Sequence, residues 1–141
     1  MKLYWCEKSR AFRIAWMMEE LGLPYERIRV DIRDNDSERD ADFLAASPLG
    51  KVPALVDGET KLWDSGAICL HLADTYPEAG LGVAPGDASR GAFLQWIMFT
   101  NAVIEPAMVE KFVGREVQPL RYGHGSFDQM IETLENGISA G

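Results

Sequence analysis

The sequence predicts an α/β domain followed by an all-α region, and three patterns along the chain support this prediction. Over residues 1–78 the apolar spacing changes between the period of a strand and that of a helix, in the order β, α, β, α, β, β, α. Residues 79–86 are rich in glycine, proline and alanine, as linkers between domains are. Residues 87–141 show helical spacing alone. We therefore expect two domains, residues 1–78 and 87–141.

The first domain begins with a β, α, β unit. Leu3-Tyr4-Trp5 is typical of a short buried strand. A helix follows and ends at Gly22 and Pro24. The apolar face of this helix consists of Ala11, Ile14, Ala15 and Met18. The segment from Tyr25 to Asp31 alternates apolar and charged residues, which predicts a half-buried strand.

A short helix and a hairpin are expected next. The apolar residues 43–46 are followed by Ser47-Pro48, which predicts a brief helix that ends there. Residues 52–56 and 61–63 flank the turn Asp57-Gly58 and predict two antiparallel strands. Together with the first crossover, this hairpin predicts a mixed sheet covered by helices.

The remaining segments are helical. A helix from Ser65 to Tyr76 is closed by Pro77. In the second region, a first apolar helix is expected to kink or end at Pro106, and a last helix begins near Ser126.

Composition restricts the classes of function. The chain of 141 residues is 47% hydrophobic and has a formal net charge of −8, which opposes binding to nucleic acid. Two cysteines and two histidines form neither a disulfide framework nor a metal motif, so we expect no metal. The N-terminus lacks a signal-like region, and no uninterrupted apolar run approaches the roughly 18 residues of a membrane span. We expect a soluble cytoplasmic protein without a membrane partner.

Ser9 lies at the junction of the first predicted strand and the first helix. Backbone N–H groups at a helix N-terminus attract negative charge, and a serine hydroxyl can donate a hydrogen bond to a bound thiolate. Such a bond contributes roughly 1.5 to 3 kcal/mol, enough to ionise a thiol with a pKa of about 8.5 near neutral pH. Helix capping explains the position of Ser9 equally well. The residues around it are mostly basic: Lys2, Lys8, Arg10 and Arg13, against the single acid Glu7.

Two further clusters are suited to a peptide-like ligand. In the first, residues 48–55, a proline follows Val52 at the entry to a strand. If the bond from Val52 to Pro53 is cis, the backbone of Val52 can pair with a ligand as an added strand does. In the second, Asp64 and Ser65 begin a helix, where a hydroxyl and N–H groups suit a carboxylate and Asp64 suits an ammonium group. Capping is the simpler explanation of this second cluster.

The ordered set of these motifs resembles the cytosolic glutathione S-transferases, particularly bacterial members in which a serine is the active residue. The matching segments are Lys2-Leu3-Tyr4, Ser9-Arg10-Ala11-Phe12-Arg13, residues 19–26, residues 47–55 and residues 64–68. The resemblance implies a thioredoxin-like first domain and a helical second domain. It also implies a homodimer that uses glutathione as co-substrate and a hydrophobic electrophile as second substrate, in detoxification.

The resemblance also implies roles for single residues. Ser9 would activate the glutathione thiol, and Val52, beside a cis Pro53, would pair with the cysteinyl backbone. The γ-glutamyl group would be held by Asp64 and Ser65. Lys51 would face the glycyl carboxylate. The pocket for the second substrate would include Phe12, Phe99 and Val103.

Two alternatives stay open. Cys6 precedes Ser9 with the spacing of a monothiol glutaredoxin site, so a thiol-disulfide oxidoreductase that uses Cys6 is a second hypothesis. A module that binds glutathione or a protein without catalysis is a third. Members of the family continue through further helices, so we expect the second domain to be incomplete. This predicts a fragment of a longer protein, an incomplete sequence, or an apolar surface covered by dimerisation.

Overall fold

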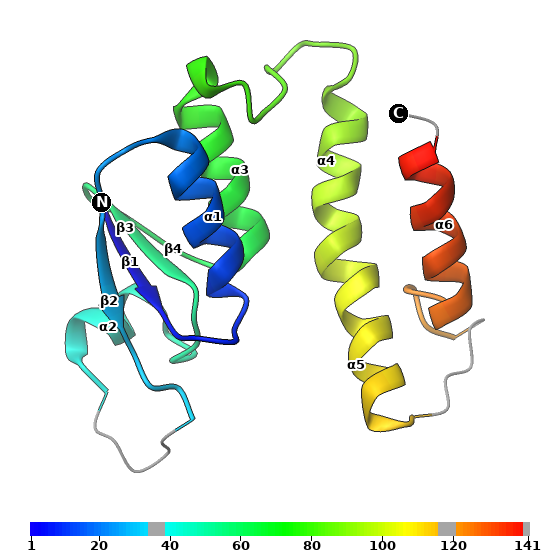
Figure 1. Cartoon of the computed structure of the whole chain (residues 1–141), viewed down its shortest axis with the longest axis horizontal. Helices are drawn as coiled ribbons and strands as arrows, with labels where there is room; N and C mark the ends of the chain where they lie inside the picture. The colour runs from blue at the N-terminus through cyan, green and yellow to red at the C-terminus, as the bar shows by residue number, and fades with distance from the viewer. Residues whose placement is uncertain (34–38, 116–120, 140–141) are drawn as a thin grey trace. The chain divides into compact units, whose positions relative to one another are not determined.

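A computed structural model of the chain describes residues 1–33, 39–115 and 121–139. The chain divides into two compact units, Met1–Asp87 and Ala88–Gly141. Each unit has its own helices, and the first also contains the sheet (Figure 1).

The first unit is built on a mixed sheet of four strands in the order β2-β1-β3-β4. The strands are β1 (Lys2–Trp5), β2 (Glu26–Arg29), β3 (Ala54–Asp57) and β4 (Thr60–Trp63). β1 is parallel to β2 and antiparallel to β3, and β3 and β4 form the hairpin. The β1 register places Leu3 opposite Arg27 on one side and Leu55 on the other.

Helices cover both faces of this sheet. They are α1 (Ala11–Leu21), α2 (Ala41–Ala46), α3 (Ser65–Thr75) and the short 3₁₀ helix η1 (Pro77–Ala79). α1 and α3 bury one face, around Leu3 and Leu55, while α2 buries the other, where Tyr4 packs on Phe43 (Figure 1). Leu3 and Tyr4 point to opposite faces because side chains alternate along a strand. This βαβαββα order confirms the predicted thioredoxin-like fold.

The second unit is helical, and its first helix continues through Pro106. Its elements are α4 (Arg90–Phe99), the π-helical segment η2 (Thr100–Ile104), α5 (Glu105–Val113) and α6 (Phe127–Ser139). Of the two outcomes expected at Pro106, a kink or an end of the helix, the end is wrong. The backbone N–H of Glu105 donates to the Thr100 carbonyl, five residues earlier, and this wider turn directly precedes the proline. A wider turn accommodates both the missing N–H and the ring of proline.

Side chains of the loop before α6 and of α6 itself pack on the helix that precedes them. Met130 is buried, and the ring of His124 hydrogen-bonds Glu110 Oε2 at 2.7 Å. A Cβ added to Gly137 would overlap the Trp96 ring, so α6 approaches α4 closely at that point. The second unit therefore has its own tertiary contacts.

One helical stretch of the second unit, Arg90–Val113, has the length and apolar composition of a membrane-crossing helix, with a mean hydropathy of 1.2. It is not an uninterrupted apolar run, because Gln95, Asn101 and Glu105 lie within it. Only 6% of its most apolar window is buried within the described residues. The absence of a membrane partner stays a prediction.

Candidate active site

The N-terminus of α1 borders a cavity of about 640 Å³. Three segments that are distant in sequence meet there: the turn before α1 and its first residues, the chain after β2, and the loop before β3. The lining residues are Lys8, Ser9, Arg10, Phe12, Arg13, Ile32, Lys51 and Val52. The residues around Ser9 and the cluster at residues 48–55, both marked in the sequence, therefore contribute to one cavity.

Ser9 lies one residue before Arg10, the N-cap of α1, and lines the cavity. Its hydroxyl accepts a hydrogen bond from the Ala11 N–H at 3.2 Å and donates one to the Cys6 carbonyl at 2.6 Å. The Ser9 hydroxyl thus bonds the first N–H of α1 from a position that also lines the cavity. Because a hydroxyl has a single proton, Ser9 must rotate that proton away from Cys6 to donate to a ligand.

Arg13 links the cavity to the start of α3. It lies one helical turn after Ser9, and its Nη1 donates to Ser65 Oγ at 3.3 Å across 52 positions of sequence. Ser65 is buried, while Asp64 caps α3 by accepting hydrogen bonds from two backbone N–H groups. Asp64 and Ser65 do not line the cavity themselves, but Ser65 contacts Arg13, which does.

The loop before β3 is held by a buried serine. The Ser47 hydroxyl donates to the Lys51 carbonyl at 2.7 Å and accepts from the Lys51 N–H at 3.1 Å. Gly50 has a φ of 61°, a conformation that glycine adopts without steric cost. The bond from Val52 to Pro53 is cis, as the resemblance implies. These contacts place Lys51 and Val52 at the cavity.

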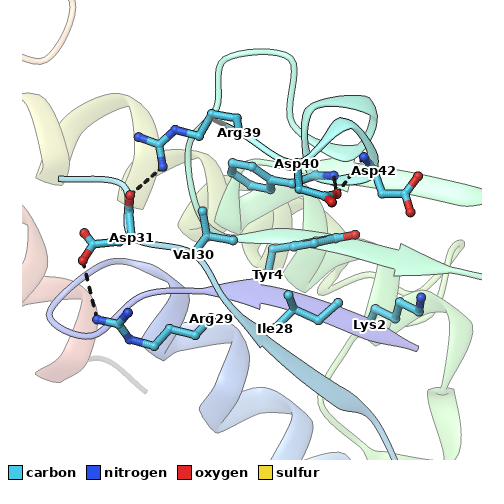
Figure 2. Close-up of a pocket in the computed structure, with 10 residues that line it drawn as sticks. Lys2, Tyr4, Ile28, Arg29, Val30, Asp31, Arg39, Asp40 and Asp42 are labelled. Carbon is cyan, nitrogen blue, oxygen red and sulfur yellow. Dashed lines mark hydrogen bonds and ion pairs between the residues drawn. The ribbon is translucent and has the colours of Figure 1, made fainter. Parts of the chain in front are cut away.

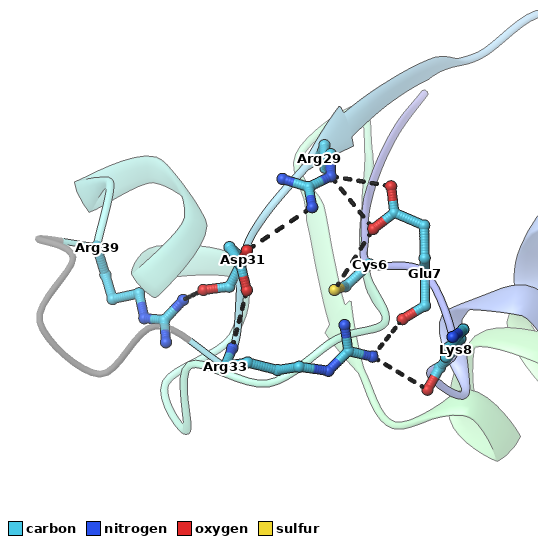
Figure 3. A network of polar contacts seen from close by, with 7 residues as sticks. All are labelled: Cys6, Glu7, Lys8, Arg29, Asp31, Arg33 and Arg39. Carbon is cyan, nitrogen blue, oxygen red and sulfur yellow. Dashed lines mark hydrogen bonds and ion pairs between the residues drawn. The ribbon is translucent and has the colours of Figure 1, made fainter.

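Charged side chains from the end of β2 and beyond fix the turn that precedes Ser9 (Figure 3). Arg29 Nε donates to both carboxylate oxygens of Glu7, at 2.9 and 3.2 Å. Arg33 Nη2 donates to the Glu7 carbonyl at 2.6 Å and to the Lys8 carbonyl at 3.5 Å. The hydrogen bond from Arg29 holds the pKa of Glu7 below its usual value.

Cys6 lies beside this network but does not line the cavity. Its side chain is 1% exposed, and Sγ lies 3.9 Å from a Glu7 carboxylate oxygen (Figure 3). A thiolate needs access and a cationic surrounding to react, whereas this sulfur is buried next to an anion.

A second cavity, of about 410 Å³, lies on the α2 face of the sheet (Figure 2). It is bounded by β1, β2 and the start of α2 and contains none of the site residues predicted from sequence. The ring of Tyr4 lies at this cavity, and burial, followed by the charges of Asp42 and Asp40, raises the pKa of its hydroxyl. This phenol is therefore not part of the Ser9 cavity.

The residues predicted for a second-substrate pocket belong to both units. Phe12 lines the Ser9 cavity and is 67% exposed. Phe99 ends α4 and Val103 lies in η2, both in the second unit. Their participation in a pocket with Phe12 stays a prediction.

The sequence marks Lys8, Arg10 and Arg13 only as basic neighbours of Ser9, without a role in binding, and it does not mark Ile32, which also lines the cavity. The sequence does contain a signal for Arg13, because residues four apart share a helix face and Ser9 is four positions earlier. No local signal points to Ile32, which is separated from α1 by β2.

The electrostatics of the cavity favour an anion. All of its charged lining residues are cationic, and the N–H groups that begin α1 add a partial positive charge. Among the residues that the structure describes, no group of three or more side chains is arranged to hold a metal ion. The arrangement can therefore stabilise a bound thiolate or carboxylate.

Known proteins resemble the chain in sequence and in fold. Residues 1–74 match the model of the glutathione S-transferase N-terminal domain. The chain is 36% identical over 98 residues to glutathione S-transferase 3 of Zea mays and 32% identical over 146 aligned positions to a zeta-class enzyme of Euphorbia esula. It covers 44% and 60% of the lengths of these relatives, and 69% and 100% of its own length is aligned.

Solved structures of glutathione transferases resemble this chain in fold. A glutathione transferase from Methylococcus capsulatus superposes with a TM-score of 0.78 at 27% identity, over 99% of this chain and 70% of the other. A sphingomonad glutathione S-transferase complexed with glutathione gives a TM-score of 0.68 at 28% identity, over 99% of this chain and 67% of the other.

Proposed function

Because the chain belongs to the glutathione S-transferase family, we propose that it transfers the glutathione thiolate to an electrophilic carbon of an apolar small molecule. The observation that carries this proposal is the convergence of Ser9, Lys51 and Val52 on one cationic cavity. Relatives solved with glutathione bound add support for glutathione as the co-substrate.

Each part of glutathione has a proposed partner. Ser9 donates its hydroxyl proton to the sulfur, and the backbone of Val52 pairs with the cysteinyl unit. Ser65, together with Arg13, which already contacts it, holds the γ-glutamyl carboxylate. Asp64 accepts from the ammonium group, and Lys51 faces the glycyl carboxylate.

The reaction needs a thiolate at neutral pH. A free thiol has a pKa of about 8.5, and a hydrogen bond from Ser9 together with the N-terminus of α1 lowers it. The proton leaves to solvent, the sulfur forms a bond to the electrophilic carbon, and the leaving group, such as the chloride of an aryl chloride, departs with its bonding electrons. The serine is thus a stabiliser of charge rather than a base, because its own hydroxyl is too weak an acid to ionise.

The location, oligomeric state and biological role of the whole protein are also proposals. We propose a cytoplasmic, homodimeric, serine-type enzyme of the bacterial branch that acts in detoxification. Family membership and the Ser-Arg-x-x-Arg pattern that begins at Ser9 support these proposals. The chain spans less than two thirds of the two plant relatives described above.

A titration followed by an assay tests the proposal. Isothermal calorimetry with glutathione is expected to give one site per chain, and the chain is expected to conjugate glutathione to an activated aryl chloride. Binding without turnover on a panel of electrophiles would favour a non-catalytic module instead. Absence of binding would contradict the proposal.

A further inference from the structure

The cavity on the α2 face of the sheet is separate from the Ser9 cavity and has no role in the proposed function (Figure 2). The two cavities share no lining residue. A volume of about 410 Å³ is within the range of small-molecule sites. One polar group in its wall is a phenol, Tyr4, and the contacts of this phenol show what the cavity can bind.

The Tyr4 side chain is 4% exposed, and its ring packs on Phe43 with the ring centroids 5.3 Å apart. Within the described part of the chain its hydroxyl has no hydrogen-bond partner, although buried tyrosine hydroxyls usually find one. No fully enclosed side-chain oxygen among the described residues lacks a partner, so the Tyr4 oxygen is not sealed in the core. It therefore opens to the cavity that Tyr4 lines and can bond a molecule bound there.

Carboxylates surround this hydroxyl. Asp40 and Asp42 line the cavity together with Tyr4 (Figure 2). Asp40 uses one oxygen, Oδ1, to accept from the N–H groups of Asp42 and Phe43, at 2.8 and 3.1 Å, which leaves Oδ2 for another donor. After burial, the charges of Asp42, Asp40 and Glu26 raise the pKa of Tyr4, so the potential at its hydroxyl is negative. A negative potential favours a cationic donor over an anion at this oxygen.

The arginines that line the same cavity bond the chain itself. Arg29 Nη2 lies 3.7 Å from an Asp31 carboxylate oxygen, and Arg39 donates to the Asp31 carbonyl at 2.6 Å (Figure 3). Lys2 also lines the cavity, and it shares the α2 face with Tyr4 because it lies two positions earlier on β1. An ammonium group in the cavity would be repelled by Lys2, which gives the inference a test of sign.

Apolar side chains form another part of the wall. Ile28 lies opposite Tyr4 in the register of β1 and β2, and Val30 follows on the same face. A molecule that bonds the phenol and the carboxylates and also covers this wall has a cationic donor and an apolar body.

We infer that this cavity binds a small organic ammonium ion, whose N–H groups donate to the Tyr4 oxygen and to the carboxylates of Asp40 and Asp42 while its apolar part packs on Ile28 and Val30. The inference goes beyond the proposed function, because it involves neither Ser9 nor the glutathione thiol. Binding is non-covalent, so no bond of the ligand forms or breaks.

Three probes with the same apolar body test the charge: 2-phenylethylamine, 2-phenylethanol and 3-phenylpropionate. Each is titrated into the whole chain at pH 7, where the amine is protonated, and binding is followed by calorimetry and by backbone amide NMR shifts. The amine is expected to bind about tenfold more tightly than the alcohol, because hydrogen bonds to charged groups are the stronger ones, and the carboxylate is expected to bind more weakly than either. Shifts are expected at Tyr4, Ile28 and Asp42 rather than at Ser9. Saturating glutathione is expected to change the Kd of the amine by no more than about twofold.

Substitutions assign the site. Tyr4→Phe is expected to raise the Kd of the amine about three- to tenfold without lowering Tm, because the removed hydroxyl bonds nothing in the described protein. Asp42→Asn is expected to raise it about two- to fivefold. Asp128→Asn, which removes the acid in the first turn of α6 as Asp42→Asn does in α2, is the matched control. Lys2→Gln is expected to lower the Kd about two- to fivefold, because it removes a like charge.

Several results would overturn the inference. If 3-phenylpropionate binds at least as tightly as the amine and Lys2→Gln weakens it, the site suits an anion and the inference is wrong. It is equally wrong if no probe binds to a chain that circular dichroism shows to be folded, or if Tyr4→Phe and Asp42→Asn both leave the affinity for the amine unchanged. Conjugation of glutathione at Ser9 is measured separately and is independent of these results.

Discussion

At the scale of single residues, Ser9 shows how one hydroxyl serves two purposes. It accepts from the Ala11 N–H, the first of α1, and donates its proton to the Cys6 carbonyl at 2.6 Å. A ligand sulfur in the cavity would compete for that proton. The bond from the Ala11 N–H is kept, because the lone pairs of Ser9 Oγ still accept it.

Removal of this hydroxyl is the most direct test of the proposed chemistry. Ser9→Ala is expected to lower kcat for conjugation by about tenfold or more, with the glutathione affinity largely kept, because the lost bond acts on the thiolate. Stopped-flow or steady-state assays give kcat, and calorimetry gives the affinity.

Cys6→Ser is the companion variant. It is expected to leave conjugation nearly unchanged, because the Cys6 thiol is buried and does not line the cavity. Loss of activity in Cys6→Ser together with full activity in Ser9→Ala would assign the reactive group to Cys6 instead.

Glu7 gives the turn before Ser9 a pH dependence. Its pKa is lowered, first by the hydrogen bond from Arg29, so its stabilising contribution is present above the unfolded-state value near 4.5 and is lost as pH falls through the lower folded value. Glu7→Gln is therefore expected to be less stable than wild type at pH 7, and the difference is expected to vanish well below pH 4.5.

Urea unfolding at several pH values measures this effect. Glu59→Gln, at the hairpin turn, is the matched control for the loss of one exposed carboxylate. A stability gap for Glu7→Gln that persists unchanged in acid would show that the ion pair with Arg29 is not its origin.

At the scale of elements, the loop between α2 and β3 depends on one buried side chain. Ser47 is fully buried and bonds both backbone groups of Lys51, which makes it the internal partner of a turn without regular structure. Backbone groups outside helices and strands need other hydrogen-bond partners, and here the Ser47 hydroxyl supplies one for both groups of Lys51. The positions of Lys51 and Val52 follow from it.

Ser47→Ala is expected to destabilise the chain by about 1 to 3 kcal/mol, because it removes two part-buried hydrogen bonds, each contributing roughly 0.5 to 1.5 kcal/mol. Since Lys51 and Val52 lose their fixed positions, KM for glutathione is expected to rise more than kcat falls. Ser139→Ala, which removes only an exposed hydroxyl bonded within α6, is the control. Unchanged KM in a folded Ser47→Ala would separate the loop from ligand binding.

At the scale of the whole molecule, the second unit depends on the close approach of α6 to α4. The added Cβ at Gly137 overlaps the Trp96 ring, whereas a Cβ at Gly91, in α4, meets nothing within 4 Å. One glycine is thus needed for packing and the other is not.

This difference predicts opposite effects of the same substitution. Gly137→Ala is expected to destabilise the second unit by about 1 to 3 kcal/mol, because Trp96 must move. Gly91→Ala is expected to stabilise α4 by about 0.5 to 1 kcal/mol, since alanine loses less backbone entropy in a helix. Thermal unfolding followed by tryptophan fluorescence measures both, and a neutral Gly137→Ala would show that the helices do not meet there.

The sequence by itself determined the order of elements in the first unit, the thioredoxin-like fold and the family. Strand alternation, helical spacing, and the glycines and prolines that end helices and turns act over a few residues, so they can be recognised without coordinates. The same motifs marked Ser9, Val52 and Ser65 as candidates.

Only the tertiary structure decided which of these candidates lie together. The contact of Arg13 with Ser65 spans 52 positions, and Lys8 and Ile32 join the cavity through a turn and a strand end that Arg33 and Arg29 hold in place. It also decided that the helix passes Pro106, through the wider turn before it. Such features depend on packing between distant segments, which no local pattern in a single sequence encodes.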